Sequence, residues 1–298
     1  MGSAFSLMIS SGNASKDPPA KPGLGDLPES CVASVLLYLD PPEICRLAML
    51  NRAFRGASSA DFIWESKLPL NYDSVIQRVY DDGGVQENGN CGFPEDLCKK
   101  DIYSRLCRTK SFDGGAKVVW LDKGTGKFCL SISSGAGGLA ITGIDDRRYW
   151  SRLQTEESRF RSVAYLQQTW WFEVDGDFEF PFTAGTYSLF FRLQLGKTSK
   201  RFGRRVCNTE HVHGWDVKPV RFQLSTSDGQ NATSQCYIKE PGKWTCYHAG
   251  DFTVVDPSTP TKVKFSMTQI DCTHTKGGLC VDSVCVYPSE FKEKLLLF

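Results

Sequence analysis

Six tryptophans set among carboxylates are the residues of this chain best suited to ligand chemistry. All lie after residue 112: Trp120, Trp150, Trp170, Trp171, Trp215 and Trp244. A tryptophan ring covers the C–H face of a sugar while carboxylates accept hydrogen bonds from its hydroxyls. Core packing is the alternative role for each ring. Because Trp170 and Trp171 are adjacent and would face opposite ways on a strand, we expect at least one of them in the core. For Trp150 the sequence leaves exposure and burial open.

The four histidines provide no catalytic set. None lies in a nucleophile elbow, a phosphate-binding loop or a zinc-protease motif. His211 and His213, with Cys207 or Asp216, have the residue types of metal ligands, but a surface loop explains them as well. The twelve cysteines include no Cys-x-x-Cys pair, so we expect them to be mostly buried thiols. The sequence therefore predicts a non-catalytic protein with no metal and no cofactor.

Charge and hydropathy exclude further classes. The 35 basic residues nearly balance the 34 acidic ones, which gives no electrostatic reason to expect nucleic acid. No apolar run is long enough to span a bilayer and no signal peptide is recognisable, so we expect no stable membrane insertion and a cytoplasmic or nuclear location. Gly2, with Ser6, fits the loose N-myristoylation pattern, for which coincidence is the alternative.

The part of the chain that contains these tryptophans and histidines has mainly the two-residue periodicity of β-strands. Between Tyr187 and Leu195 apolar residues recur at every second position, and the same alternation appears in 220–224 and 263–267. Glycine- and aspartate-containing turns separate these segments. The sequence therefore predicts a mainly β fold, an antiparallel β-sandwich or jelly-roll domain over 112–290, with a C-terminal tail at 291–298.

The segment before it has helical periodicity. A disordered leader is expected over 1–23, three helices over 24–70 and a helical linker over 71–111. In the first helix the apolar residues have the i, i+3, i+4 spacing of a single stripe, and Asp40 is expected to cap the second, whose stripe runs from Ile44 to Phe54. Ser58-Ser59 offers a cap for a third, short helix containing Trp64. So small a unit exposes much apolar surface, which either docks on a partner or packs as a lid on the next domain.

The segment resembles an F-box, the module that binds the Skp adaptor of cullin-based ubiquitin ligases. The resemblance is carried by Leu27-Pro28, Asp40-Pro-Pro-Glu, Leu47-x-x-Leu-Asn-x-x-Phe54 and Trp64, in that order. Phe54 stands where many F-boxes have tryptophan. The resemblance implies that seven residues divide between the core of the module and the adaptor interface: Leu27, Pro28, Val35, Leu36, Leu39, Ile44 and Leu47.

The segment after residue 112 resembles phloem protein 2, the Nictaba-like lectin family of plants. Its motifs follow in the family's order and include Lys117-x-x-Trp120, Leu139-Ala-Ile-Thr142, Tyr149-Trp150, Trp171-Phe-Glu-Val-x-Gly176 and Gly250-Asp251-Phe252. The coupling to an F-box looks like the F-box members of that family. The resemblance implies that this domain binds N-acetylglucosamine oligomers or N-glycan cores.

The family's lectin site uses two tryptophans and two acids, and this chain matches half of that set. Trp150 and Asp251 match one tryptophan and one acid, with Asp251 a methylene shorter. Gly143 stands at the other tryptophan position and Ser258 at the other acid, with Asp256 as a stand-in. Loss of one stacking ring removes about 1–3 kcal/mol of contact. The resemblance thus supports the fold more firmly than the sugar specificity.

Together these features predict a substrate-recognition subunit of an SCF-type ubiquitin ligase. The F-box is expected to dock the Skp adaptor and through it the cullin-based ligase, while the lectin-like domain binds a target, a glycoprotein bearing N-acetylglucosamine or N-glycans. One alternative is a stand-alone carbohydrate-binding lectin. Another is a ligase receptor that recognises a protein epitope without sugar.

Overall fold

The chain forms two compact units, Met1–Ile63 and Trp64–Phe298. The computed structural model describes residues 27–81, 96–201 and 204–292, and Gly2 lies outside them. The helices are α1 Glu29–Leu36, α2 Pro41–Leu47, α3 Arg52–Ala57, α4 Asp61–Lys67, α5 Tyr72–Asp81 and α6 Lys99–Leu106, with 3₁₀ turns η2 Asp113–Gly115 and η3 Ser289–Phe291. All the long strands belong to the second unit, so a helical region precedes a mainly β domain, as the sequence predicts.

In the first unit the expected second helix is two helices. Asn51 interrupts it, because its side-chain oxygen accepts a hydrogen bond from the backbone N–H of Phe54 at 2.9 Å and so caps α3. Asp40 does occupy the N-cap position of α2, with Pro41 as the first helical residue, but its side chain makes no capping hydrogen bond. The apolar stripe expected between Ile44 and Phe54 therefore belongs to two separate elements.

Ser58 differs from its predicted role. It lies at the C-terminal end of α3, where its hydroxyl donates to the carbonyl of Arg55 at 2.8 Å. The prediction that it caps the following helix is wrong, because α4 begins only at Asp61. A serine hydroxyl can bond a preceding carbonyl as readily as a following N–H, and sequence does not distinguish the two.

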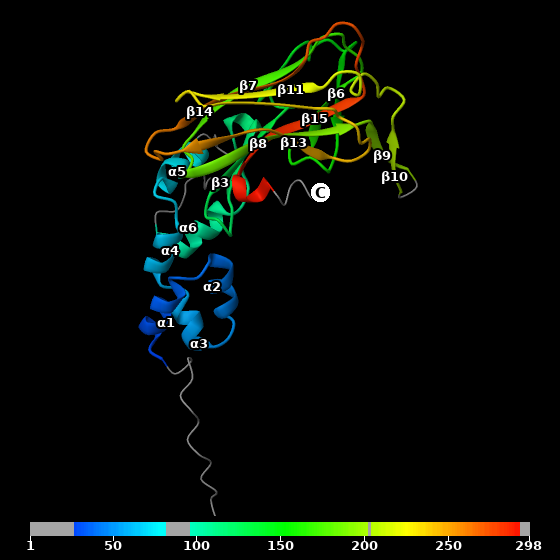
Figure 1. Ribbon diagram of the computed structural model, residues 1–298. Helices are drawn as coiled ribbons and strands as arrows, with labels where there is room; N and C mark the ends of the chain where they lie inside the picture. The colour runs from blue at the N-terminus through cyan, green and yellow to red at the C-terminus, as the bar shows by residue number, and fades with distance from the viewer. Residues whose placement is uncertain (1–26, 82–95, 202–203, 293–298) are drawn as a thin grey trace, which may run out of the picture. The chain divides into compact units, whose positions relative to one another are not determined.

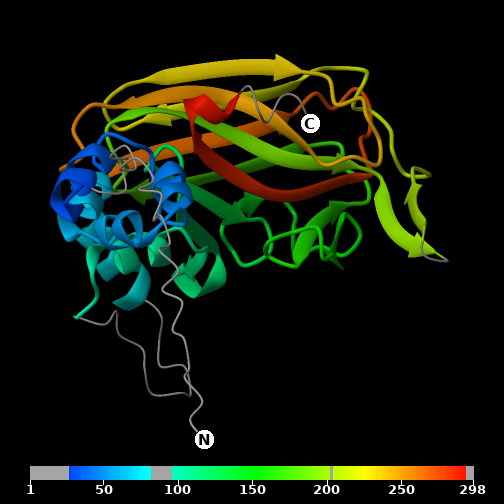
Figure 2. The same ribbon diagram turned by 90° about the horizontal axis from the view of Figure 1, so that it is seen from below.

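The second unit is a sandwich of antiparallel sheets. Its strands are β1 Lys110–Phe112, β2 Lys117–Leu121, β3 Phe128–Ser133, β4 Ala140–Ile141, β5 Trp150–Gln154, β6 Ser162–Leu166, β7 Phe172–Phe180, β8 Gly185–Leu195, β9 Lys197–Arg201, β10 Arg204–Asn208, β11 Val220–Thr226, β12 Asn231–Cys236, β13 Thr245–Val254, β14 Thr261–Gln269 and β15 Leu279–Pro288. Figure 1 shows β7, β11 and β14 as one layer over β8, β13 and β15, and in Figure 2 the hairpin β9–β10 extends beyond the layers.

The larger sheet has eight strands and forks at β15. Its order runs β1-β2-β3-β15-β6-β5, while β8 pairs with the other edge of β15 and with β13. The smaller sheet has the order β12-β11-β14-β7-β4, and β9 pairs only with β10. Strands that are distant in sequence are thus paired, as in Greek-key sandwiches.

Aromatic rings fill the space between the two sheets. The ring of Phe191 on β8 lies 5.4 Å from that of Phe222 on β11 and 5.8 Å from that of Phe265 on β14. These distances are typical of favourable aromatic pairs. Gly176 on β7 makes room for this packing, because a Cβ there would lie 2.7 Å from the Phe265 ring. The opposite faces of both sheets remain available to form sites.

The helices α5 and α6 belong to the second unit and pack against its first strands. Ile102, Tyr103 and Leu106 form the buried face of α6, and the Trp64 ring lies 5.3 Å from that of Tyr103. Cys98, which shares the helical spacing of this face, is instead exposed at the N-terminal end of α6.

Cysteine burial is mixed, and the described cysteines are all free thiols. The buried ones are Cys129, Cys280 and Cys285, and the exposed ones are Cys31, Cys45, Cys98 and Cys272. The expectation of mostly buried thiols therefore holds for only part of the set.

Candidate functional site

The structure divides the seven residues predicted for the F-box between core and surface. Leu36 and Ile44 are 0% exposed and form the core of the first unit with Val32, Ala33, Phe54 and Ala57. Leu27, Pro28 and Val35 are exposed, and Leu39 and Leu47 are half-buried. The sequence pattern did not make this distinction. An amphipathic stripe shows which side of a helix is apolar, but it does not show how deeply each residue on that side is buried.

Further apolar residues are exposed on the same unit. Tyr38 is 86%, Met49 74% and Leu50 66% exposed, and Val35 is 55% exposed. The available sequence signal was the i, i+3 relation of Val35 to Tyr38, which continues the outer face of α1. Met49 and Leu50 follow α2 directly and precede the Asn51 cap. A small unit with so many exposed apolar residues has the character of a docking surface.

The two residues predicted for the sugar site lie apart in the β domain. Cross-strand register places Trp150 level with Leu279 of β15 and Asp251 level with Tyr287 of the same strand. The eight residues between those levels (287 − 279) correspond to roughly 25 Å at about 3.3 Å per residue. The structure therefore does not bring Trp150 and Asp251 together around one sugar ring.

Trp150 is a core residue, only 3% exposed. Its ring packs 6.3 Å from that of Phe172, and its Nε1–H donates to the carbonyl of Thr142 at 3.1 Å. Gly143 follows Thr142 with a φ of 76°, so this position favours glycine and carries no side chain for stacking. The partial match to the lectin site thus has no accessible ring at either tryptophan position.

Asp251 is tied to its own neighbours. Ser188 Oγ and His248 Nε2 each lie 2.6 Å from Oδ1, and Lys292 Nζ lies 3.0 Å from Oδ2. Burial acts to raise the pKa of Asp251, but the hydrogen bonds from these partners outweigh it and the pKa is lowered. Asp251 is thus an ionised carboxylate held by three groups on the outer face of the larger sheet.

The loop after β13 holds the two remaining positions of the predicted site. Ser258 donates its backbone N–H and its hydroxyl to Asp256 Oδ1 at 2.9 and 2.6 Å, and these bonds lower the pKa of Asp256. The Asp256 carboxylate is therefore already engaged in hydrogen bonds within its own turn.

Trp170 and Trp171 are both exposed, 53% and 46% respectively, so the prediction that at least one lies in the core is wrong. Alternation does not apply to them because they precede β7, which begins at Phe172. Below them Lys276, 0% exposed, donates hydrogen bonds from Nζ to the carbonyls of Trp170 (2.7 Å), Gln269 (2.9 Å) and Asp271 (2.9 Å). The hydrogen bonds of Lys276 therefore hold in place the backbone that carries these two rings.

A buried ion pair organises the outer face of the larger sheet. At Asp282, strand β15 changes partner from β6 to β3, and its register with β8 shifts there. The Asp282 carboxylate, 2% exposed, accepts hydrogen bonds from Arg192 Nη1 and Ser158 Oγ, both at 2.5 Å. A buried charge requires such partners. Asp282 thus fixes the loop between β5 and β6 to the fork of the sheet.

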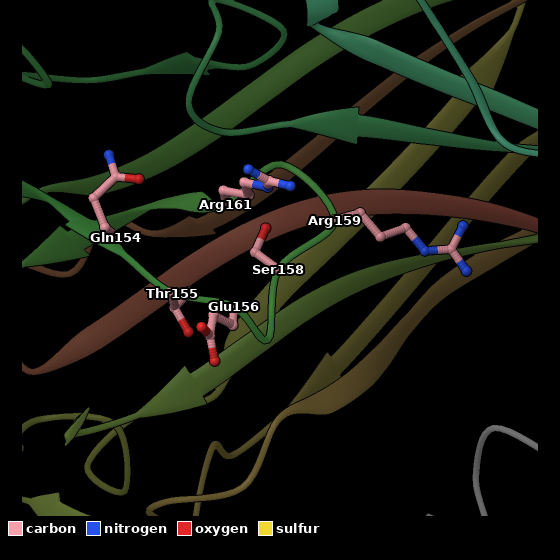
Figure 3. Close-up of a pocket in the computed structure, with 6 residues that line it drawn as sticks. All are labelled: Gln154, Thr155, Glu156, Ser158, Arg159 and Arg161. Atoms are coloured by element: carbon pink, nitrogen blue, oxygen red, sulfur yellow. The ribbon is translucent and has the colours of Figure 1, made fainter. Parts of the chain in front are cut away.

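A cleft of about 530 Å³ is lined by this loop. Figure 3 shows the lining residues, which are Gln154, Thr155, Glu156, Ser158, Arg159 and Arg161. Arg161 has a φ of 57°, the left-handed region that non-glycine residues seldom adopt. The Arg159 guanidinium lies 4.0 Å from the Trp120 ring centroid, and that of Arg192 lies 4.6 Å from the Trp244 ring. Two arginines, Arg159 and Arg161, and one acid, Glu156, are thus the charged side chains that line the cleft.

Sequence reasoning missed the contacts around this loop because they join residues from distant parts of the chain. Arg192 and Asp282 are ninety residues apart, and Trp244 Nε1 donates to Glu157 at 2.7 Å across a similar gap. No local motif signals such pairs. The available clue was Arg192, the charged residue within the sequence of β8.

Metal and membrane features are absent from the described part of the chain. There, no group of three or more His, Cys, Asp or Glu residues is placed to hold a metal ion. His213 instead contacts the carbonyl of His211 through Nδ1 at 2.8 Å and Thr275 through Nε2 at 3.2 Å. Nor is any described helix long and apolar enough to cross a bilayer.

The helical unit and the sandwich define an F-box protein with a lectin-like β domain. Residues 24–66 match the F-box domain and residues 127–288 match phloem protein 2. F-box protein PP2-A13 of Arabidopsis thaliana is 61% identical over 274 residues, covering 92% of this chain and 91% of its own. F-box protein PP2-A11 of the same plant is 59% identical over 300 residues, covering 99% of each. The chain belongs to the phloem protein 2 family of F-box proteins.

Solved structures show only distant similarity. CBM35 from Cellvibrio japonicus Abf62 is 15% identical, with a TM-score of 0.32, and the match covers 53% of this chain and 92% of that one. A family 35 carbohydrate binding module from Clostridium thermocellum is 12% identical, with a TM-score of 0.31, over 53% of this chain and 98% of that one. No functional conclusion follows from similarity at this level.

Proposed function

We propose that this protein is a substrate-recognition subunit of an SCF-type ubiquitin ligase. The observation that carries the proposal is the apolar surface of the first unit, where Val35, Tyr38, Met49 and Leu50 are exposed around a core containing Leu36. Burial of such side chains in an interface releases about 25 cal/mol per Å² of apolar surface. In this proposal the surface docks the Skp adaptor, and ubiquitin transfer occurs elsewhere in the complex.

Co-purification with the Skp adaptor tests this. Val35→Asp and Leu50→Asp in the full chain should each weaken adaptor binding by about ten-fold or more, because each places a charge in an apolar interface. The matched control is Val217→Asp, which changes a residue of similar exposure, 53%, in the second unit. Wild-type protein that fails to bind the adaptor, or binding that survives both substitutions, would overturn the proposal.

For the β domain we propose capture of a glycoprotein target bearing N-acetylglucosamine or N-glycans. Family membership and exposed tryptophans near carboxylates support this, since such pairs suit the apolar and polar faces of a sugar. A stand-alone lectin would share this sugar binding but would lack adaptor binding. The adaptor experiment therefore separates the two functions.

A second candidate is recognition of a protein epitope without sugar. The exposed Arg159 and Arg161 at the loop cleft favour it, because guanidinium groups bind carboxylates with paired hydrogen bonds. Target capture that persists after enzymatic deglycosylation of the target, and that is lost with Arg159→Ala and Arg161→Ala together, would favour this candidate over the glycan.

A further inference from the structure

We propose that the outer face of the smaller sheet is the glycan-binding surface of this protein, with Trp171 as its stacking ring. The surface is built by β7, β14, β11 and β12 and contains a groove of about 600 Å³. Its occupant is a neutral oligosaccharide. The inference rests on the proposed capture of a glycoprotein and assigns that function to a place in the fold.

Strand register aligns polar side chains across the groove. Asp175 on β7 is level with Ser266 on β14, which is level with Gln223 on β11, which is level with Thr233 on β12. Adjacent strands lie about 4.8 Å apart, so this row crosses the whole groove. The next row repeats the pattern with Asp177, Lys264, Ser225 and Asn231. Carboxylate, hydroxyl and amide groups are the partners that sugar hydroxyls and acetamido groups require.

These groups have unused hydrogen-bonding capacity. Within the described part of the chain, no hydrogen bond joins the side chains of Asp175, Gln223 or Ser266 to another protein group, and all three are only half-buried. The outer face of the larger sheet differs, because there Asp282 is already bonded to Arg192 and Ser158. A ligand on the smaller sheet can therefore form hydrogen bonds without breaking bonds within the protein.

Trp171 precedes β7 and does not itself line the groove, but its partner Glu173 lies two residues before the lining residue Asp175 on the same face of β7. Trp171 lies two residues before Glu173, and its Nε1–H donates to Glu173 Oε2 at 3.0 Å, which holds the ring. Thr169 Oγ1 donates to the carbonyl of Trp171 at 2.9 Å, and Lys276 fixes the preceding carbonyl, so the backbone is held as well. An exposed aromatic ring held in one orientation loses little conformational entropy when a ligand binds.

The charged side chains that line the groove are two acids, Asp175 and Asp177, and one base, Lys264. Elsewhere on the same face Glu173 and Glu179 of β7 are accompanied by Lys262 of β14 and Arg221 of β11, so the acidic character is confined to the groove itself. Burial and the charge of Glu173 raise the pKa of Asp175, so a further negative charge beside it is unfavourable. Phosphorylated, sulfated and nucleic-acid ligands are therefore disfavoured relative to neutral sugars.

Binding to an array of neutral oligosaccharides, including N-acetylglucosamine oligomers and N-glycan cores, tests the inference on the full chain. The best-bound oligosaccharide is then titrated calorimetrically. Trp171→Ala should weaken its binding about ten-fold or more, as expected for loss of one stacking ring. Gln223→Ala should weaken it several-fold. Trp244→Ala changes a ring that contacts Glu157 and Arg192 beside the larger sheet, so it should leave the affinity unchanged, and thermal melting verifies that each variant is folded.

Three results would overturn the inference. If Trp171→Ala and Gln223→Ala bind as tightly as wild type, the site lies elsewhere, although the glycan target stands. If Trp244→Ala alone abolishes binding, the site lies beside the larger sheet. If folded wild-type protein binds no oligosaccharide on the array, the glycan target fails together with this inference. Adaptor binding is measured separately and is unaffected by any of these results.

Discussion

Arg192 and Asp282 form an ion pair with a 2.5 Å contact at the residue where β15 exchanges one partner strand for another. Because the Asp282 side chain is 2% exposed, it depends on Arg192 for charge compensation. Arg192→Met should lower the free energy of unfolding of the β domain by about 3 kcal/mol, since it leaves a buried carboxylate without its counter-charge. Denaturant titration followed by tryptophan fluorescence measures this.

The matched control for that change is Arg148→Met. The Arg148 side chain is 79% exposed in its ion pair with Asp146, so solvent screens the pair and its loss should leave the free energy of unfolding essentially unchanged. Equal effects of the two substitutions would contradict the structural role given to the buried pair.

In the first unit, neighbouring residues should respond differently to truncation. Leu36→Ala should lower the free energy of unfolding by about 2–4 kcal/mol, because Leu36 is 0% exposed and its loss leaves a cavity. Val35→Ala should change it by about 0.5 kcal/mol or less, because Val35 is 55% exposed. Amide hydrogen exchange of the first unit reports both. A larger effect at Val35 would show that α1 buries the opposite face.

Lys276 should be required for order at the tryptophan pair. Lys276→Met removes three hydrogen bonds to carbonyls in a site with 0% exposure, so we expect a loss of about 2–4 kcal/mol in the free energy of unfolding. The emission of Trp170 and Trp171 should also become more accessible to acrylamide quenching. An unchanged quenching rate in a folded variant would argue that the backbone at this pair is held by other contacts.

Sugar binding by the groove should be lost in acid. The ionised Asp175 carboxylate accepts hydrogen bonds with both oxygens, whereas protonation turns one oxygen into a donor. Glu173 and Asp177 flank it on β7 and Lys264 lies on β14, with Lys262 and Arg221 further along the same face. Burial and Glu173 raise the pKa of Asp175, so binding should be present above that pKa and fall as the pH drops through it, at a higher pH than for an ordinary aspartate (pKa about 3.9). Titration of affinity against pH, with Asp175→Asn as the insensitive variant, measures this; a flat profile would exclude Asp175 from the site.

Thiol reactivity should follow burial. Burial raises the pKa of Cys236 to about 11 and that of Cys280 to about 12, so both are protonated at neutral pH and poor nucleophiles. Cys31 and Cys272 are exposed. Brief alkylation of the native protein followed by peptide mass spectrometry should label Cys31 and Cys272 well before the half-buried Cys236 and the buried Cys280. Early labelling of Cys280 would indicate that the sandwich opens readily at β15.

Local periodicity predicted the types of the secondary-structure elements, and short motifs indicated the family. Period-two alternation from Tyr187 to Leu195 predicted a strand, and β8 covers it because side chains on a strand alternate between its faces. Helical periodicity before residue 70 predicted a small helical unit, and the resemblance of its motifs indicated an F-box, which the family match confirms. Both signals are local, since they depend on residues a few positions apart, and local periodicity survives in a single sequence.

Only the tertiary structure decided which side chains meet and which are exposed. It buried Trp150, exposed Trp170 and Trp171, and joined Arg192 to Asp282 across ninety residues. These outcomes depend on strand order and register, where a shift of one residue moves a side chain to the other face of the sheet. Register is fixed by packing between distant strands, and no short stretch of sequence specifies it.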